Sequence, residues 1–382
     1  MLLFTSVDQD TMVSRMNTRT VAPELPDSSD WLPYLRPAIE QNWYTNYGPV
    51  NTRFEARLEQ LYAASDEAVV SATNATAALS ACLIAEAISG QVICPAFTFQ
   101  ATAAAILGAN CSPFIVDVDP VTGVVAPEML EAAFKKSNAR AAIVLAPYGI
   151  TTDFHEHEKI CSELGKLLII DNAAGLGVTR AGKSFNGEGG VVREVYSLHA
   201  TKPFGIGEGA AIFAPTSKAA SLRAAMNFGI QTHTGSGALC PPYWGINGKM
   251  SEFHAAIGLA VADRMADRVV ARQEMALRWI ENLQDSPVTI FHTAVENTPW
   301  QVFPIILPSE GHVLKCVEAA NNRGIELRRY YAPSLGACRG MPSLGACPNA
   351  QRLAERVLVL PIRSYMPKDA QMALISEIKK CL

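Results

Sequence analysis

The sequence has little charge and lacks the cysteine spacing of metal or redox sites. Charged residues make up 18% of the 382 residues, the formal net charge is −4, and no long run of lysine and arginine occurs. A nucleic-acid-binding surface usually concentrates basic residues, so this composition predicts no nucleic-acid partner. No two cysteines stand in a Cys-x-x-Cys pattern, and we expect the nine thiols to be free, mostly buried and not bound to a metal.

A long uninterrupted apolar run is also missing. The most apolar region, 77–110, is broken by Glu86, by polar residues such as Gln91 and Gln100, and by Pro95, whereas a membrane-spanning helix needs about 20 apolar residues in succession. Residues 1–10 lack the basic start and the long apolar core of a signal peptide. We therefore expect no membrane partner and a cytoplasmic location.

What is present is enough apolar sequence, 49% of the residues, for two folded domains. Between about residues 68 and 215, short apolar runs alternate with helix-like stretches, which is typical of a mostly parallel sheet. The expected strands are Ala68–Ser71, Gln91–Cys94, Pro113–Asp117, Ala142–Leu145, Leu167–Ile170, Val195–Leu198 and Ala210–Phe213. One or two long helices are expected from Ser251 to about Leu283. The sequence predicts an α/β fold, with a large domain over 1–265 and a small C-terminal α/β domain over 266–382.

Two polar residues stand just beyond expected strands. Lys202 follows the strand-like run 191–198 and precedes a glycine-rich turn, and Asp171 directly follows the apolar run 166–170. An amine buried at such a place loses hydration, which favours the neutral form that makes a Schiff base with an aldehyde. A carboxylate beyond the neighbouring strand can keep a pyridine nitrogen protonated, so that the ring withdraws electrons. Whereas either residue alone would be an ordinary strand-end residue, together they predict a catalytic pair for pyridoxal 5′-phosphate.

Six segments that include this pair occur in the order of a known family between about Trp43 and Pro361. They are Asn74–Leu79, Pro95–Thr102, Asp171–Gly177, Ser197–Lys202, Gly207–Ala210 and Gly245–Glu252. They resemble the cofactor motifs of the DegT/DnrJ/StrS sugar-nucleotide aminotransferases. The resemblance implies a fold-type I, aspartate aminotransferase-like large domain that binds pyridoxal phosphate. It also implies transfer of an amino group from glutamate to a nucleotide-linked keto sugar, with most similarity to the branch that converts dTDP-4-keto-6-deoxyglucose to dTDP-4-amino-4,6-dideoxyglucose.

The same resemblance suggests which residues contact the cofactor. Ala75 and Thr76 open a helix whose N-terminus would hold the phosphate, with Ser197 as a second donor. Phe99 would stack on the pyridine ring. Asn247 would reach the phosphate bound by a neighbouring subunit, which implies a homodimer with shared active sites. The ordinary alternatives are a helix cap at the first site, a core aromatic at the second and a helix-entry asparagine at the third.

The chain departs from the family at two positions. Ala174 stands where the family has Gln or His bonded to the cofactor phenolate oxygen, which leaves Asn172 or a water for that role. The Tyr-x-Pro-x-His element is present as Tyr331–Leu335, without the histidine. The open alternatives are amination of a 3-keto sugar or of a UDP- or GDP-linked sugar, and a non-catalytic sensor of the same fold. A related 3-dehydratase is disfavoured, because that group has histidine in place of Lys202.

Two apparent metal motifs are interpreted otherwise. Asp117 and Asp119 lie at a strand end before a proline turn. His155 and His157 are two positions apart, so on a helix they point in different directions and are expected to belong to a solvated face. The sequence predicts no metal site.

Overall fold

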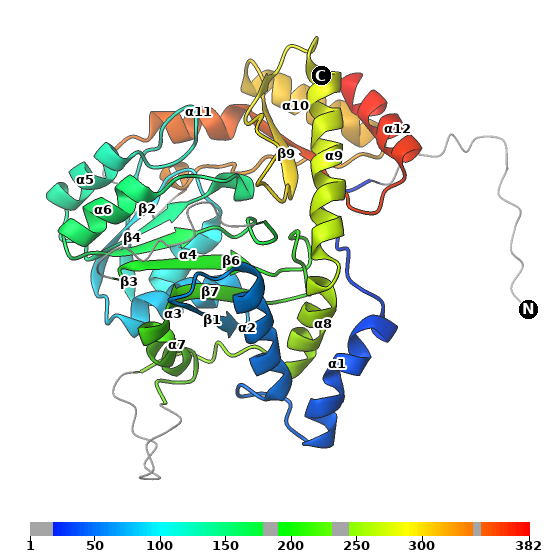
Figure 1. Cartoon of the computed structure of the whole chain (residues 1–382). Helices are drawn as coiled ribbons and strands as arrows, with labels where there is room; N and C mark the ends of the chain where they lie inside the picture. The colour runs from blue at the N-terminus through cyan, green and yellow to red at the C-terminus, as the bar shows by residue number, and fades with distance from the viewer. Residues whose placement is uncertain (1–17, 179–189, 231–243, 339–344) are drawn as a thin grey trace, which may run out of the picture.

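The computed structural model describes residues 18–178, 190–230, 244–338 and 345–382, and its main feature is a seven-stranded sheet (Figure 1). The strands are β1 (Glu67–Ala72), β2 (Gly90–Pro95), β3 (Cys111–Val116), β4 (Ala141–Leu145), β5 (Leu167–Asp171), β6 (Val192–Ser197) and β7 (Ala210–Pro215). Their order across the sheet is β1-β7-β6-β5-β4-β2-β3. Of these seven strands only β7 runs opposite to the rest, and it follows β6 through the segment that carries Lys202. All seven predicted strands are confirmed.

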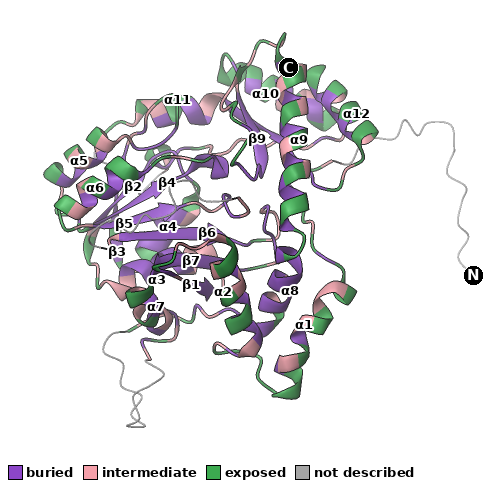
Figure 2. Ribbon diagram, in the orientation of Figure 1, coloured by how far each residue is buried: buried purple, intermediate pink, exposed green. Residues whose placement is uncertain are grey.

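The apolar runs form strands here because both faces of the sheet are covered, so nearly every strand residue is buried (Figure 2). Helices α3, α4 and α7 pack together on the sheet, α5 packs against α6, and α2 and α8 pack together near β1. The helices around this sheet are α1 (Ser28–Glu40), α2 (Pro49–Tyr62), α3 (Ala75–Ala85), α4 (Gln100–Gly108), α5 (Pro127–Lys136), α6 (His155–Glu163), α7 (Ala219–Met226) and α8 (Glu252–Ala262). Three short 3-10 turns are η1 (Pro147–Gly149), η2 (Thr216–Lys218) and η3 (Leu335–Ala337).

A second, smaller sheet lies toward the C-terminus. It contains β8 (Thr289–Ile290), β9 (Val302–Ile306) and β10 (Val357–Pro361), all antiparallel, in the order β10-β9-β8. Its helices are α9 (Met265–Leu283), α10 (Glu310–Asn322), α11 (Pro348–Arg356) and α12 (Lys368–Lys379). The α/β class with a large and a small sheet is therefore confirmed.

Helix α9 connects the two parts. Its first turns belong to the apolar cluster of α8, through Met265 and Val269, and its later turns belong to the core of the small sheet, through Met275 and Trp279. The predicted long helical region is thus two helices, α8 and α9. The domain boundary at 265/266 falls where α9 begins and stays a prediction, because α9 packs in both cores.

One interpretation of the sequence was wrong. His157 does not belong to a solvated face: it is buried, with Nε2 2.6 Å from the carbonyl oxygen of Val125 and its ring against Phe154. The α6 face that carries His157 and Cys161 turns toward the interior, while His155 stays exposed beside Asp153. The metal interpretation is still not supported, since no cluster of metal-ligating side chains occurs in the described ranges.

Asp117, the other rejected metal candidate, has a structural task. Its carboxylate accepts hydrogen bonds from the backbone N–H groups of Asn349 and Ala350, at 3.1 and 2.9 Å, and so caps the start of α11. Among the helices of the described residues, none is both long and apolar enough to cross a membrane.

Candidate active site

The register of the large sheet brings the predicted site residues to one edge. Ala72 at the end of β1 pairs with Ala210 of β7, which pairs with Ser197 at the end of β6. Asp171 ends β5 and pairs with Val195, two residues before Ser197. The carboxyl ends of the parallel strands therefore meet beside the loops that follow them, where ligands of α/β proteins usually bind.

Lys202 lies in the tight turn between β6 and β7. Its backbone N–H donates to the carbonyl of His199 at 2.8 Å, and the turn closes through a 2.9 Å bond from the N–H of Ile206 to the carbonyl of Leu198. A Cβ on Gly205 would lie 2.5 Å from the carbonyl oxygen of Ala200, so glycine is required at this close approach. The sequence of the turn thus sets where the lysine points.

The Lys202 side chain reaches into the protein. Its Nζ donates to Oε1 of Gln301 at 3.2 Å. Loss of hydration lowers the pKa of the amine to about 8, although the nearby negative charge of Asp171 opposes that shift. Roughly a tenth of the amine is therefore neutral at pH 7, far more than for an ordinary lysine, and this is the form that a nucleophile or a base requires.

Asp171 is buried at the end of β5. Its Oδ2 accepts a hydrogen bond from the Thr102 hydroxyl at 3.0 Å, and its Oδ1 accepts one from the backbone N–H of Ala173 at 3.3 Å. Burial raises the pKa of the carboxyl, and the Thr102 hydrogen bond and the charge of Lys202 oppose that rise. The Thr102 hydroxyl in turn lies 2.7 Å from the hydroxyl of Thr98, so the two hydroxyls and the carboxylate form a hydrogen-bonded chain.

The predicted phosphate end is the N-terminus of α3. Asn74 caps this helix, because its Oδ1 accepts from the N–H of Ala77 at 2.8 Å. Ala75 and Thr76 form the first turn and are partly buried. Ser197 is buried at the end of β6, and its hydroxyl accepts from the N–H of His199 at 3.3 Å. The cap and a phosphate site are compatible, since Asn74 engages only one of the first N–H groups of the helix.

Comparison with known proteins agrees with this geometry. The model of the DegT/DnrJ/EryC1/StrS aminotransferase family matches residues 27–379. The chain belongs to this family. It is 28% identical over 380 residues to the dTDP-4-amino-4,6-dideoxy-D-glucose transaminase of Escherichia coli, covering 96% of this chain and 99% of that protein. It is 26% identical over 325 residues to the UDP-2-acetamido-2-deoxy-3-oxo-D-glucuronate aminotransferase of Pseudomonas aeruginosa, covering 84% and 87%.

A solved structure of DesI with its TDP-sugar product superimposes with a TM-score of 0.82 at 29% identity, covering 94% of this chain and 91% of that one. Membership in the family makes the protein a pyridoxal-phosphate-dependent aminotransferase of nucleotide-linked sugars. The predicted family, fold, enzyme class and cofactor are all confirmed.

The residues at the sheet edge fit this cofactor. A partly buried amine with a lowered pKa, a buried carboxylate and a helix N-terminus are the three groups that an aldehyde, a pyridine nitrogen and a phosphate need. The assignment of each residue to its cofactor atom remains a prediction.

Phe99 and Asn247 lie nearby on accessible surface. The Phe99 ring is 53% exposed at the start of α4 and touches Tyr330 edge-on, whereas Phe97 is fully buried. Asn247 is exposed, and its Oδ1 accepts from Lys249 Nζ at 2.8 Å. The carbonyl of the next residue, Gly248, accepts from the N–H of Thr73 at 2.7 Å, so this segment borders the start of α3 in its own chain.

Tyr331, which was not among the predicted cofactor contacts, lies close enough to Asp171 to feel its charge, and Tyr148 stacks on it. Tyr148 and Tyr331 stack with ring centroids 5.4 Å apart and an interplanar angle of 6°. Burial raises the pKa of the Tyr331 phenol, and the negative charge of Asp171 adds to that rise. The tyrosine of the altered Tyr-x-Pro element therefore belongs to the site.

The turn around Tyr148 also explains the surroundings of Ala174. A Cβ on Gly149, which has φ +75°, would lie 2.3 Å from the carbonyl oxygen of Ala174, so the turn packs directly on that backbone. Asn172 does not turn toward this place: its Nδ2 donates to Oε1 of Glu194 at 2.8 Å. The structure thus gives no support to Asn172 as the substitute donor.

The other residues that sequence reasoning missed are Thr102 and Gln301. Thr102 is the last residue of the Pro95–Thr102 motif, but nothing in the sequence distinguishes a threonine that bonds a buried carboxylate from any other threonine on a helix. Gln301 lies outside every motif, 99 residues after Lys202.

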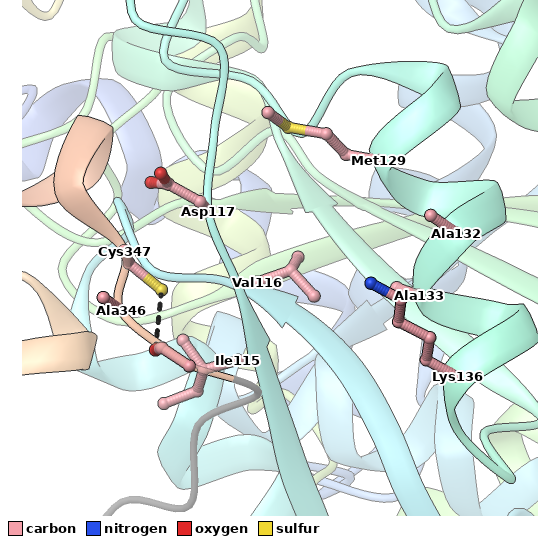
Figure 3. Close-up of a pocket in the computed structure, with 10 residues that line it drawn as sticks. Ile115, Val116, Asp117, Met129, Ala132, Ala133, Lys136, Ala346 and Cys347 are labelled. Carbon is pink, nitrogen blue, oxygen red and sulfur yellow. Dashed lines mark hydrogen bonds between the residues drawn. The ribbon is translucent and has the colours of Figure 1, made fainter.

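A hollow of about 310 Å³ occurs elsewhere, between the end of β3, helix α5 and the segment before α11 (Figure 3). Val116, Asp117, Lys136 and Cys347 are among its lining residues, and none of the predicted cofactor contacts is. Burial and the charge of Asp117 raise the pKa of the Cys347 thiol to about 11, so this thiol is mostly protonated and unreactive.

Proposed function

We propose that the enzyme transfers the amino group of glutamate to C4 of dTDP-4-keto-6-deoxyglucose, giving 2-oxoglutarate and dTDP-4-amino-4,6-dideoxyglucose. The observation that carries the chemistry is the amine of Lys202, with a pKa of about 8, beside the buried Asp171 at the carboxyl edge of the sheet. The substrate is supported by nearly full-length similarity to the E. coli enzyme, whose name contains this amino sugar, and to DesI, which was solved with a TDP-sugar.

In this proposal Lys202, Asp171 and Thr102 act at the reacting end of the cofactor. When bound, pyridoxal phosphate supplies an aldehyde carbon and an electron-withdrawing ring. Lys202 would hold the aldehyde carbon through Nζ and, when its amine is free, would take the proton from the donor Cα and return it. Asp171 would hold the ring nitrogen and keep it protonated, while Thr102 keeps the carboxylate oriented.

The remaining contacts bind and orient. We assign the N–H groups and the hydroxyl of Ala75 and Thr76, with the hydroxyl of Ser197, to the phosphate. The exposed Phe99 ring is assigned to stacking on the pyridine. Asn247 is assigned to the phosphate bound by a second copy of the chain, so that the active unit is a homodimer.

We also infer a cytoplasmic location. Eight cysteines of the described residues are free, several of them buried, which suits a reducing compartment.

A second candidate substrate class has its own support. The P. aeruginosa relative acts, by its name, on a UDP-linked 3-oxo sugar, and it matches 84% of this chain. UDP-linked 3-keto sugars are therefore the runner-up, with GDP-linked sugars after them.

The test is a turnover screen of purified protein. dTDP-, UDP- and GDP-linked 3-keto and 4-keto sugars are each incubated with glutamate, and 2-oxoglutarate and the amino sugar are measured, the latter by mass spectrometry. We expect the highest kcat/KM with dTDP-4-keto-6-deoxyglucose and none with Lys202→Ala protein. A higher value with a UDP-3-keto sugar would overturn the assignment. Absence of turnover with every keto sugar, despite bound cofactor, would favour the sensor alternative.

A further inference from the structure

The amine of Lys202 is held by a side chain from the segment that leads into β9. Oε1 of Gln301 accepts its N–H at 3.2 Å, while Nε2 of the same amide donates to the carbonyl oxygen of Thr201 at 3.2 Å. Gln301 is buried, with 7% of its surface exposed. Because the carbonyl of Thr201 can only accept, the amide must turn its NH₂ to Thr201 and its oxygen to Lys202.

The position of Gln301 is fixed by its neighbours. It directly precedes β9, and the preceding residue, Trp300, is fully buried with its indole N–H donating to the carbonyl of Val295 at 3.1 Å. The carbonyl of Trp300 accepts from Arg272 at 2.9 Å, and Arg272 forms a buried ion pair with Glu24 at 2.6 Å. The amide thus extends from a rigid backbone to the flexible end of a lysine.

We propose that Gln301 is a positioning residue that holds the Lys202 amine whenever the amine is not bonded to the cofactor. An acceptor takes one N–H of a neutral amine and leaves its lone pair free to receive a proton. A donor at the same place would occupy the lone pair and block the base. An amide also adds no negative charge, so it does not stabilise the ammonium form as strongly as a carboxylate would.

The consequence for the reaction is a proton transfer with fixed geometry. The lone pair of Nζ would take the proton from the donor Cα, the electron pair of the broken C–H bond would stay with the donor carbon, and the resulting ammonium would later return the proton. Misplacing a reacting group by about 1 Å can cost roughly 10²-fold in rate. The inference rests on the family's chemistry and not on which sugar is the substrate.

The experiment uses cofactor and glutamate alone, without any sugar. Cofactor-free wild type, Gln301→Met, Gln301→Glu and Gln273→Met are mixed with pyridoxal phosphate, and the rise of visible absorbance is followed from pH 6 to 10. Gln273 is the matched control, because its amide donates to the carbonyl of Thr298 at 3.4 Å in the same region. Far-UV circular dichroism and borohydride trapping at Lys202 confirm folding and the site of attachment.

For wild type and Gln273→Met, the rate at which visible absorbance rises should reach half of its high-pH value near pH 8, because the neutral amine of Lys202 is the form that reacts. In Gln301→Glu the new carboxylate should raise that midpoint by about 1–3 pH units, since an opposite charge within reach favours the ammonium. Gln301→Met has similar length but only a weakly accepting sulfur, so conversion of bound cofactor by saturating glutamate should slow by about 10- to 100-fold, with little change in the glutamate concentration for half-saturation.

Two outcomes would contradict the proposal. An unmoved midpoint in Gln301→Glu would show that residue 301 does not face the amine. A wild-type glutamate half-reaction in Gln301→Met would show that the amide only fills space. If Gln301→Met does not fold, the pH midpoint of the similarly sized Gln301→Glu still tests whether residue 301 faces the amine. Failure of the sugar screen under "Proposed function" would leave these measurements untouched.

Discussion

Replacing Thr102 with valine should raise the pH at which the enzyme becomes active. The Thr102 hydroxyl donates to Oδ2 of the buried Asp171 at 3.0 Å, and valine has nearly the same shape without the hydroxyl. A hydrogen bond to a charged group contributes about 1.5–3 kcal/mol. Since one pKa unit corresponds to about 1.4 kcal/mol, its loss should raise the pKa of Asp171 by about 1–2 units beyond its already elevated value.

The expected readout is the acid limb of the pH profile for the glutamate half-reaction. If the ionised form of Asp171 is needed, that limb should move up by the same 1–2 pH units in Thr102→Val. Thr102→Ser keeps the hydroxyl and should stay close to wild type. Thr98→Val removes the outer hydroxyl, 2.7 Å from Thr102, and should produce a smaller shift.

The stability of the cofactor-free protein gives a second measurement. The folded pKa of Asp171 is raised, so the folded state binds more protons than the unfolded state between the two pKa values. The contribution of Asp171 to the free energy of unfolding is therefore largest below the unfolded pKa and is lost as pH rises through the folded pKa. Thr102→Val should extend that loss to higher pH in urea titrations. Identical pH profiles and identical unfolding curves for Thr102→Val and wild type would refute the reasoning.

Lys202→Ala protein should still bind the cofactor through Asp171 and the start of α3 but should not transaminate, and normal turnover by it would contradict the proposed base. Asp171→Asn keeps the shape without the charge, so the rate should fall roughly 10²–10⁴-fold, and a value within a few-fold of wild type would remove Asp171 from the role of ring partner. Asn247→Ala should bind cofactor weakly, and subunit exchange with Lys202→Ala should give mixed dimers with one intact site and more activity than either parent. If the exchanged mixture gains nothing although Asn247→Ala has lost cofactor, Asn247 acts within its own chain, where the next residue, Gly248, bonds to Thr73.

The sequence by itself predicted the strands of the large sheet and the closeness of Asp171 and Lys202. The short apolar runs identified all seven strands of the large sheet, because a strand buried on both faces must be apolar throughout. Since ligands collect at the carboxyl ends of such strands, Asp171 and Lys202 could be placed together from their positions alone. The family also followed from the sequence, since its motifs are local and keep their order.

The environment of that pair was decided only by tertiary structure. Thr102 meets Asp171 across 69 residues and Gln301 meets Lys202 across 99, and no local pattern marks a threonine or a glutamine as a partner of a buried charge. His157 was misjudged for a related reason: spacing along a helix shows which residues share a face, but only packing shows which face is covered. Local periodicity encodes the elements, whereas the pKa values and partners of the site depend on contacts that exist only when the two sheets have folded together.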